Sequence, residues 1–85
     1  MSYSYQEEKK KLMTDDGQRI FTKARDRILY LLKVSGVIKQ YPAILGCGVS
    51  HSFMESAILD RMVEIGDIRE IKRDCFGQDR IFIKE

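Results

Sequence analysis

The residues that could support catalysis or metal binding are few in this chain. His51 is the single histidine, and the two cysteines, Cys47 and Cys75, lie far from each other and from any metal-ligand spacing. Asp15 and Asp16 are adjacent, but their surroundings have the composition of a flexible turn, which is a poor place for paired acid–base work. No nucleophile–histidine–carboxylate set and no phosphate-binding loop is present. We therefore expect no enzyme, no metal and no cofactor.

Length and composition indicate one small globular domain. The chain has 85 residues, of which 44% are hydrophobic and 33% charged, and its formal net charge is +2. So small a charge neither requires nor excludes a polyanionic partner. No apolar run approaches the roughly 18 residues of a membrane span, and the polar N-terminal segment is not expected to be a secretory signal. We expect a cytoplasmic protein with reduced cysteines and no membrane partner.

The clearest predicted element is a capped helix in the second half of the chain. Ser52 is a good N-cap, and Glu55 completes the spacing of a capping box. Gly66 stands where the helix should end. A three-to-four spacing predicts that four apolar residues point inward, namely Met54, Ile58, Met62 and Ile65.

Upstream of this helix, the sequence predicts an N-terminal arm and a second long helix. The arm covers residues 1–18, with a marginal helix over Gln6–Met13 and a turn at Thr14–Gly17, and the remaining domain covers residues 19–85. Thr22 is expected to cap a helix over Lys23–Val34, with Ile20 and Phe21 folding back onto it. Gly36 should end that helix, whose inward face carries Ala24, Ile28, Leu31 and Leu32.

Short elements fill the rest of the chain. Val37 and Ile38 predict a brief strand, and Pro42 fits the first turn of a short helix over Ala43–Leu45. The segment Arg69–Lys84 alternates between apolar and charged residues around a turn at Asp74–Asp79, which predicts a β-hairpin. The order is helix, strand, helix, helix, strand, strand.

This order, together with the stretch AILGCGVSHSFMESAILDRMVEIGDI, resembles the winged-helix form of the helix-turn-helix. The residues that carry the resemblance are Ala43, Leu45, Gly48, Val49, Ser50, Leu59, Met62, Gly66 and Ile68. The distance from Ala43 to the glycine is one residue longer than usual, and the resemblance covers about Thr22 to Lys84. It implies an α+β fold: a small winged-helix domain with a three-helix core, a C-terminal β-hairpin wing and an extra N-terminal arm or short helix.

In DNA-binding winged helices, the start of the third helix enters the major groove and the wing touches the backbone. The resemblance therefore implies a transcriptional regulator that binds double-stranded DNA, with an N-terminal segment that forms a homodimer. Carried over to this chain, the DNA-contact residues are Ser50, His51, Ser52, Phe53 and Ser56 on the helix and Lys72, Arg73, Gln78 and Arg80 on the wing.

A second hypothesis rests on the charge of the third helix. Asp60 and Glu64 are expected on its solvent side, where two carboxylates would oppose a polyanionic duplex. An exposed Phe53 beside them, with Phe76 near the hairpin tip, would instead suit a protein partner. The alternative is an interaction module of phage or mobile-element type that docks on host transcription or replication machinery. The sequence leaves both hypotheses open.

Overall fold

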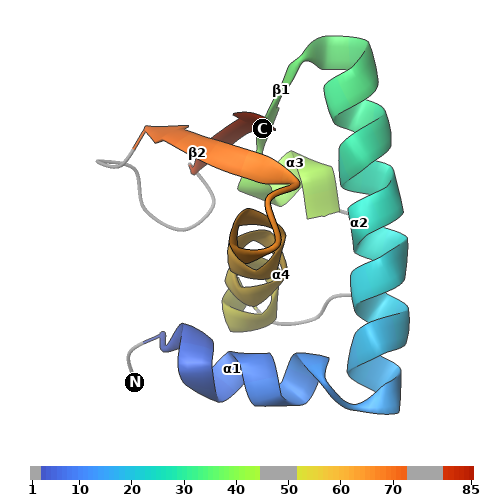
Figure 1. Cartoon of the computed structure of the whole chain (residues 1–85), viewed down its shortest axis with the longest axis vertical. Helices are drawn as coiled ribbons and strands as arrows, with labels where there is room; N and C mark the ends of the chain where they lie inside the picture. The colour runs from blue at the N-terminus through green and yellow to red at the C-terminus, as the bar shows by residue number, and fades with distance from the viewer. Residues whose placement is uncertain (1–2, 45–51, 73–79) are drawn as a thin grey trace.

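The computed structural model describes residues 3–44, 52–72 and 80–85, without the side chains of Tyr41, Pro42, Ser52 and Lys72. The chain folds into a small α+β structure with a three-stranded antiparallel sheet (Figure 1). Its elements are α1 (Tyr5–Leu12), α2 (Asp15–Ser35), β1 (Val37–Lys39), α3 (Gln40–Ile44), α4 (Ser52–Glu64), β2 (Ile68–Lys72) and β3 (Ile81–Lys84). From α2 onward, these elements follow the order predicted from the sequence.

The start of α2 differs from the prediction. Thr14 is its N-cap: the Thr14 hydroxyl accepts a hydrogen bond from the Gly17 backbone N–H at 3.0 Å. Asp15 and Asp16 occupy the first turn, where the helix dipole favours negative charge. Thr22 therefore lies inside the helix rather than capping it, and the predicted turn at Thr14–Gly17 is wrong.

Gly17 permits a close approach between α1 and α2. A Cβ at this position would lie 2.1 Å from the Lys11 carbonyl oxygen, so a larger residue would push the two helices apart. α1 is thus held tightly, and its Leu12 side chain is fully buried in the core. The predicted boundary after residue 18 falls within α2. Phe21 belongs to the helix and to the core, instead of folding back from a preceding segment.

The far end of α2 agrees with the prediction. Gly36 adopts the left-handed conformation at φ 79°, and its N–H donates to the Leu32 carbonyl at 2.8 Å. Ala24, Ile28 and Leu32 are buried along one face, and Leu31 is partly buried beside them. A short turn then leads into β1, which confirms the predicted strand at Val37–Ile38.

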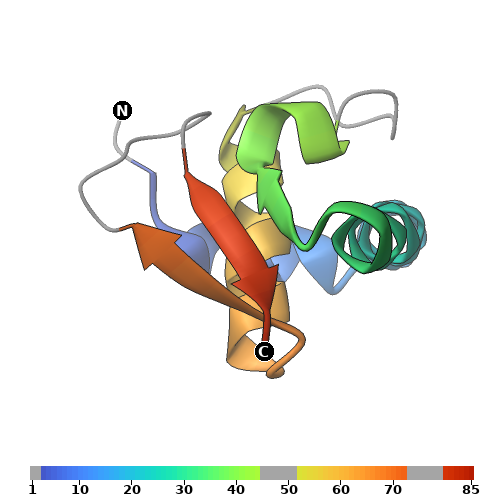
Figure 2. The same ribbon diagram turned by 90° about the horizontal axis from the view of Figure 1, so that it is seen from above.

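The sheet has the order β1-β3-β2, so the last strand of the chain lies in the middle. β2 and β3 pair antiparallel, which confirms the predicted hairpin, although its turn lies outside the described residues. Ile38, Phe82 and Ile68 point to the inner face and are buried. An irregularity between Glu70 and Lys72 shifts the register of β2. Figure 2 looks onto the opposite, outer face of the sheet.

α3 begins earlier than predicted, at Gln40, and Pro42 lies in its first turn as expected. Leu45 and the predicted turn at Gly46–Gly48 lie outside the described residues. Gln40 has no exposed surface, and its backbone N–H donates to the Arg80 carbonyl at 3.0 Å. This bond joins the start of α3 to the chain just before β3.

α4 has nearly its predicted bounds, and Gly66 follows its end at φ 86°. Ile58 and Met62 are fully buried, but Ile65 is 43% exposed because it belongs to the turn after the helix. The predicted inward position of Ile65 is therefore wrong. α4 also buries Ala57 and Leu59, since α1, α2, α3 and β2 all pack against it. The capping box cannot be followed, because the side chain of Ser52 is not described.

Candidate functional site

The face of α4 that was expected to meet a partner is covered by the N-terminal segment of its own chain. α1 lies across α4 on the side opposite the sheet (Figure 1). The Tyr3 hydroxyl donates to Asp60 Oδ2 at 2.5 Å. The Tyr5 hydroxyl donates to Glu64 Oε1 at 2.9 Å. Both carboxylates expected in solvent are thus hydrogen-bonded within the molecule.

Asp60 lies at the centre of this contact. Its side chain is only 22% exposed, because it accepts hydrogen bonds from both Tyr3 and Arg80. The prediction that Asp60 faces open solvent is therefore wrong. Burial, followed by the hydrogen bond to Asp60, raises the pKa of Tyr3 far above its usual value, so this tyrosine stays a neutral donor.

Glu64 is more exposed than Asp60 but is surrounded by donors. Lys9 Nζ lies 3.0 Å from it and Arg61 2.6 Å. Hydrogen bonds from Lys9, Arg61 and Tyr5, in that order of effect, lower the pKa of Glu64 from 4.5 to about 2. Burial and the bond to Glu64 raise the pKa of Tyr5 to about 12. The carboxylate therefore remains ionised at neutral pH, with two cations beside it.

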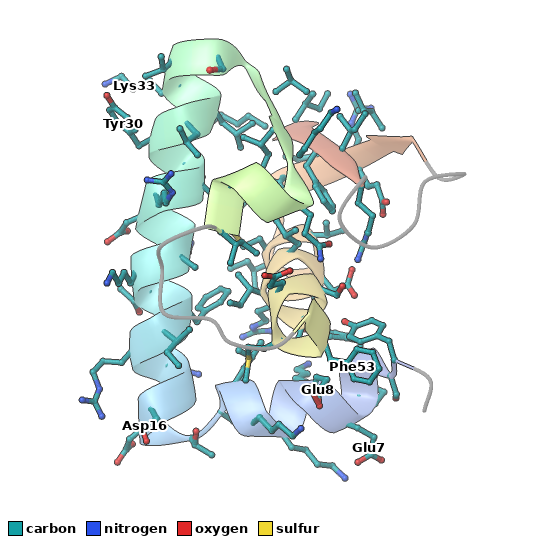
Figure 3. The ribbon with its side chains drawn as sticks, turned by 180° about the vertical axis from the view of Figure 1, so that it is seen from behind. Glu7, Glu8, Asp16, Tyr30, Lys33 and Phe53 are labelled. Atoms are coloured by element: carbon teal, nitrogen blue, oxygen red, sulfur yellow. The ribbon has the colours of Figure 1, made fainter. Side chains whose placement is uncertain are left out.

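Phe53 packs against the N-terminal segment at the start of α4. Its ring meets the ring of Tyr3 edge to face, with centroids 5.7 Å apart and planes at 61°. Figure 3 shows Phe53 at the junction of α4 with α1, while Glu7 points away on the other side of α1. Phe53 is half-buried, so it is not the free aromatic anchor that the protein-docking hypothesis required.

Arg80 was expected to contact DNA from the wing, but it faces into the molecule. Its guanidinium donates to Asp60 at 2.7 Å and to Glu70 at 2.9 and 3.1 Å, and lies 5.1 Å from the Phe82 ring centroid. Its side chain is 15% exposed. Burial alone would lower the pKa of Arg80, yet its hydrogen bonds with Glu70 and Asp60 raise it. Arg80 joins α4 to β2 rather than reaching outward.

Ser56 is the second DNA-contact candidate that turns inward. It is 8% exposed, and Gln40 Nε2 donates to its hydroxyl at 3.2 Å. Because α3 packs against this side of α4, a hydroxyl that the helical wheel placed outward lies between two helices. The prediction that Ser56 faces a partner is wrong.

The side chains of most other predicted DNA-contact residues are not described by the structure. Ser50, His51, Arg73, Phe76 and Gln78 lie outside the described residues, and only the backbone of Ser52 and Lys72 is described. Their flanking elements are placed, however. The start of α4, the end of β2 and the start of β3 lie toward the same edge of the view in Figure 2, whereas Figure 1 shows the start of α4 below the hairpin, near α1. Arg80, just before β3, donates to Asp60 of α4, so the hairpin packs beside this helix.

Two residues central to this arrangement were missed from the sequence: Tyr3 and Gln40. A signal for the first existed, because Asp60 and Glu64 form a like-charge pair at i, i+4 that destabilises an uncovered helix. Such a pair indicates that donors from another element must compensate it. Gln40 had no comparable signal, since a lone glutamine before a helix is usually exposed.

Within residues 3–44, 52–72 and 80–85, no group of three potential ligands is arranged to hold a metal ion. Among the helices described, none is long and apolar enough to cross a membrane. Comparisons of the chain with protein-family models, with curated proteins and with solved structures found no match.

Proposed function

We propose that this chain is a small winged-helix protein that binds double-stranded DNA, with the start of α4 and the β2–β3 hairpin as its contact segments. The arrangement of its elements supports the proposal. An antiparallel sheet in the order β1-β3-β2, with α2 before β1 and α3 and α4 between β1 and β2, is compatible with that fold. The observation that carries the proposal is that Arg80, just before β3, bonds both Asp60 of α4 and Glu70 of β2, which holds the hairpin beside the contact helix.

The charge that seemed to oppose DNA binding is compensated inside the molecule. Asp60 pairs with Arg80, and Glu64 pairs with Lys9 and Arg61. An ion pair presents a much weaker field to a distant phosphate than a lone carboxylate does. Asp60 and Glu64 are therefore compatible with a partner that is double-stranded DNA. The same contacts weaken the alternative of an acidic docking face, because that face is occupied.

The set of proposed contact residues changes accordingly. Ser56 and Arg80 leave it, since both are buried in contacts of their own. The helix start retains Ser50, His51, Ser52 and Phe53, and the hairpin retains Lys72, Arg73 and Gln78. Basic hairpin residues would contact phosphates and position the protein, while hydroxyl and imidazole groups would meet base edges.

Arg80 takes a positioning role in this proposal. By bonding both Asp60 of α4 and Glu70 of β2, it links the contact helix to the hairpin. The bulge between Glu70 and Lys72 lies just beyond this link and marks where β2 leads toward the hairpin end. Two contact segments held at one spacing can engage neighbouring parts of a duplex together. Regulation of transcription, a cytoplasmic location and an N-terminal homodimer stay proposals, the last against the observation that α1 already packs on its own α4.

A mobility-shift assay on mixed-sequence duplex at two salt concentrations tests the proposal. We expect binding at low salt that weakens steeply as salt rises, because each phosphate contact contributes about −0.9 to the slope of log affinity against log salt. The double variant Lys72→Glu, Arg73→Glu should abolish binding. The matched control Lys23→Glu changes an exposed cation on α2 and should leave it intact. Absence of duplex binding at low salt would contradict the proposal.

A further inference from the structure

The outer face of the sheet carries apolar side chains, and no described helix lies over it (Figure 2). Val37 in β1 and Ile81 and Ile83 in β3 alternate with the inward residues Ile38 and Phe82, and Ile71 lies at the register irregularity of β2. Val37 is 45% exposed and Ile71 50% exposed, whereas Ile81 and Ile83 on the central strand are half-buried. Figure 2 shows this outer face in front of α4, with no helix over it.

Two cations flank the apolar stripe on the edge strands. The register pairs Val37, Ile83 and Arg69 in one row across the sheet and places Lys39 beside Ile81 in the next. Ile81 and Ile83 therefore lie on the central strand β3, with Lys39 on β1 at one side and Arg69 on β2 at the other. Both cations are exposed. We call these six residues, Val37, Lys39, Arg69, Ile71, Ile81 and Ile83, the outer sheet face.

Among the described residues, no carboxylate forms an ion pair with the two cations of the outer sheet face. Arg25, Arg61 and Arg80 each pair with a carboxylate, whereas neither Arg69 nor Lys39 has an ion-pair partner in the described part of the chain. The carboxylate next to Arg69 in sequence, Glu70, turns inward to Arg80. A ligand with carboxylate groups could form ion pairs with these two cations, which lie on opposite edges of the apolar stripe.

We propose that the outer sheet face docks an acidic amphipathic helix of a partner protein. The apolar side of that helix would rest on Ile81 and Ile83, and the carboxylates along its flanks would meet Lys39 and Arg69. A sheet with apolar residues on both faces is most stable when both are covered, and a helix is the usual cover for a sheet. The surface borders the hairpin end proposed to contact DNA, because Lys72 follows Ile71 and pairs with Ile81 in the register. The inference still does not depend on that function, since it uses only the aliphatic side chains, Lys39 and Arg69.

Two other occupants fit the surface less well. A second copy of the chain, packed face to face about a two-fold axis, would bring the cationic patch of each copy against that of the other, which opposes association. A duplex would offer phosphates to the cations but would bury little of the four aliphatic side chains between them. An acidic and apolar protein segment satisfies both parts of the surface together.

A pair of synthetic helical peptides tests the proposal. Both carry leucines along one face, and they differ in the flanking residues, which are glutamates in one and lysines in the other. Each is titrated into isotope-labelled protein while the backbone amide shifts are recorded. We expect the acidic peptide to bind more tightly and its shifts to fall on β1, β2 and β3. Added salt should weaken its binding.

Two variants locate the contact. Arg69→Glu should weaken binding of the acidic peptide about five-fold and strengthen that of the basic one, since an exposed ion pair is replaced by repulsion. Ile71→Ser should weaken both peptides, because it removes apolar contact without changing charge. Lys23→Glu, on the exposed side of α2, is the matched control for charge and should change neither. Circular dichroism checks that every variant is folded.

The proposal fails if the two peptides bind equally, or if their shifts fall outside the three strands. It also fails if the protein is a dimer whose association Arg69→Glu strengthens, because a second copy would then occupy the face. Shifts on β1 and β3 produced by duplex DNA instead of the acidic peptide would assign the surface to nucleic acid and overturn the proposal as well.

Discussion

The covered face of α4 and the outer sheet face show two outcomes for surfaces of mixed polarity. On α4, two carboxylates and an aromatic ring are covered by α1 through tyrosine hydroxyls, a lysine and an edge-to-face ring contact. On the sheet, Val37, Lys39, Arg69 and Ile71 are exposed, Ile81 and Ile83 are half-buried, and no described helix lies over this face in Figure 2. The hydrogen bonds and the ion pair on α4 match donors with acceptors, whereas Lys39 and Arg69 have no ion-pair partner among the described residues. The second surface is thus the one left open for a partner.

The largest effect that separates the two surfaces should come from Leu12 of α1. This side chain is fully buried beneath the α1–α2 junction, so Leu12→Ala should lower the free energy of unfolding by about 2–5 kcal/mol. Ile71→Ala, at a half-exposed position of the outer sheet face, is the control and should change it by about 0.5 kcal/mol or less. Urea unfolding followed by circular dichroism measures both. Equal losses would mean that the sheet face is covered after all.

The next effect concerns Arg80, which links the covered helix to the hairpin. Arg80→Met leaves Asp60 and Glu70 without their cation in a half-buried setting, so we expect a loss of about 2 kcal/mol. Arg19→Met breaks an ion pair with Asp16 that is fully in solvent and should cost about 0.5 kcal/mol or less. The comparison uses the same unfolding measurement. If both arginines prove equally dispensable, the link between α4 and β2 contributes nothing to stability.

The smallest effect is the pH dependence of the α1–α4 contact. The pKa of Glu64 is about 2 in the folded chain, against 4.5 as its ordinary value. A depressed carboxyl pKa contributes stability above the unfolded value, and that contribution is lost as pH falls from about 4.5 toward 2. The free energy of unfolding of the Glu64→Gln variant should therefore fall less than that of the wild type as the pH is lowered from about 4.5 toward 2.

Glu7→Gln provides the control for that experiment, since it removes an exposed carboxylate from the other side of α1 (Figure 3). Its stability should follow the wild-type curve across the same pH range. Because the Glu64 contacts are partly exposed, added salt should reduce the difference between the two variants. A Glu64→Gln curve that keeps the wild-type slope would show that α1 is not held by this carboxylate.

Local signals predicted much of the backbone. Gly36 and Gly66 marked the ends of α2 and α4, and alternation in Arg69–Lys84 predicted the hairpin. The start of α2 was missed because Thr14 and Thr22 both have N-cap chemistry, and the choice depends on whether Phe21 finds a core to enter. Propensity alone does not distinguish two such caps.

The candidate site was much less predictable than the backbone. A helical wheel assumes that a helix buries a single stripe of residues. Because other elements pack against α4 on several sides, Ser56 is buried and Asp60 partly buried, although the wheel predicted that both are exposed. Arg80 reads as a solvated wing residue in sequence and becomes a link between α4 and β2 only when the hairpin lies beside the helix. These contacts join residues that are distant in sequence: Tyr3 and Asp60 are 57 residues apart, and Arg80 and Asp60 are 20 residues apart.

By itself, the sequence determined the α+β class, the order of elements from α2 to β3, and the glycine stops, because these depend on neighbours within a few residues. The tertiary structure alone decided which side of α4 is covered, where Arg80 points and which apolar side chains stay open on the sheet. Those outcomes depend on how donors and acceptors from distant segments meet, and the free energy of each pairing exists only once the chain has brought them together.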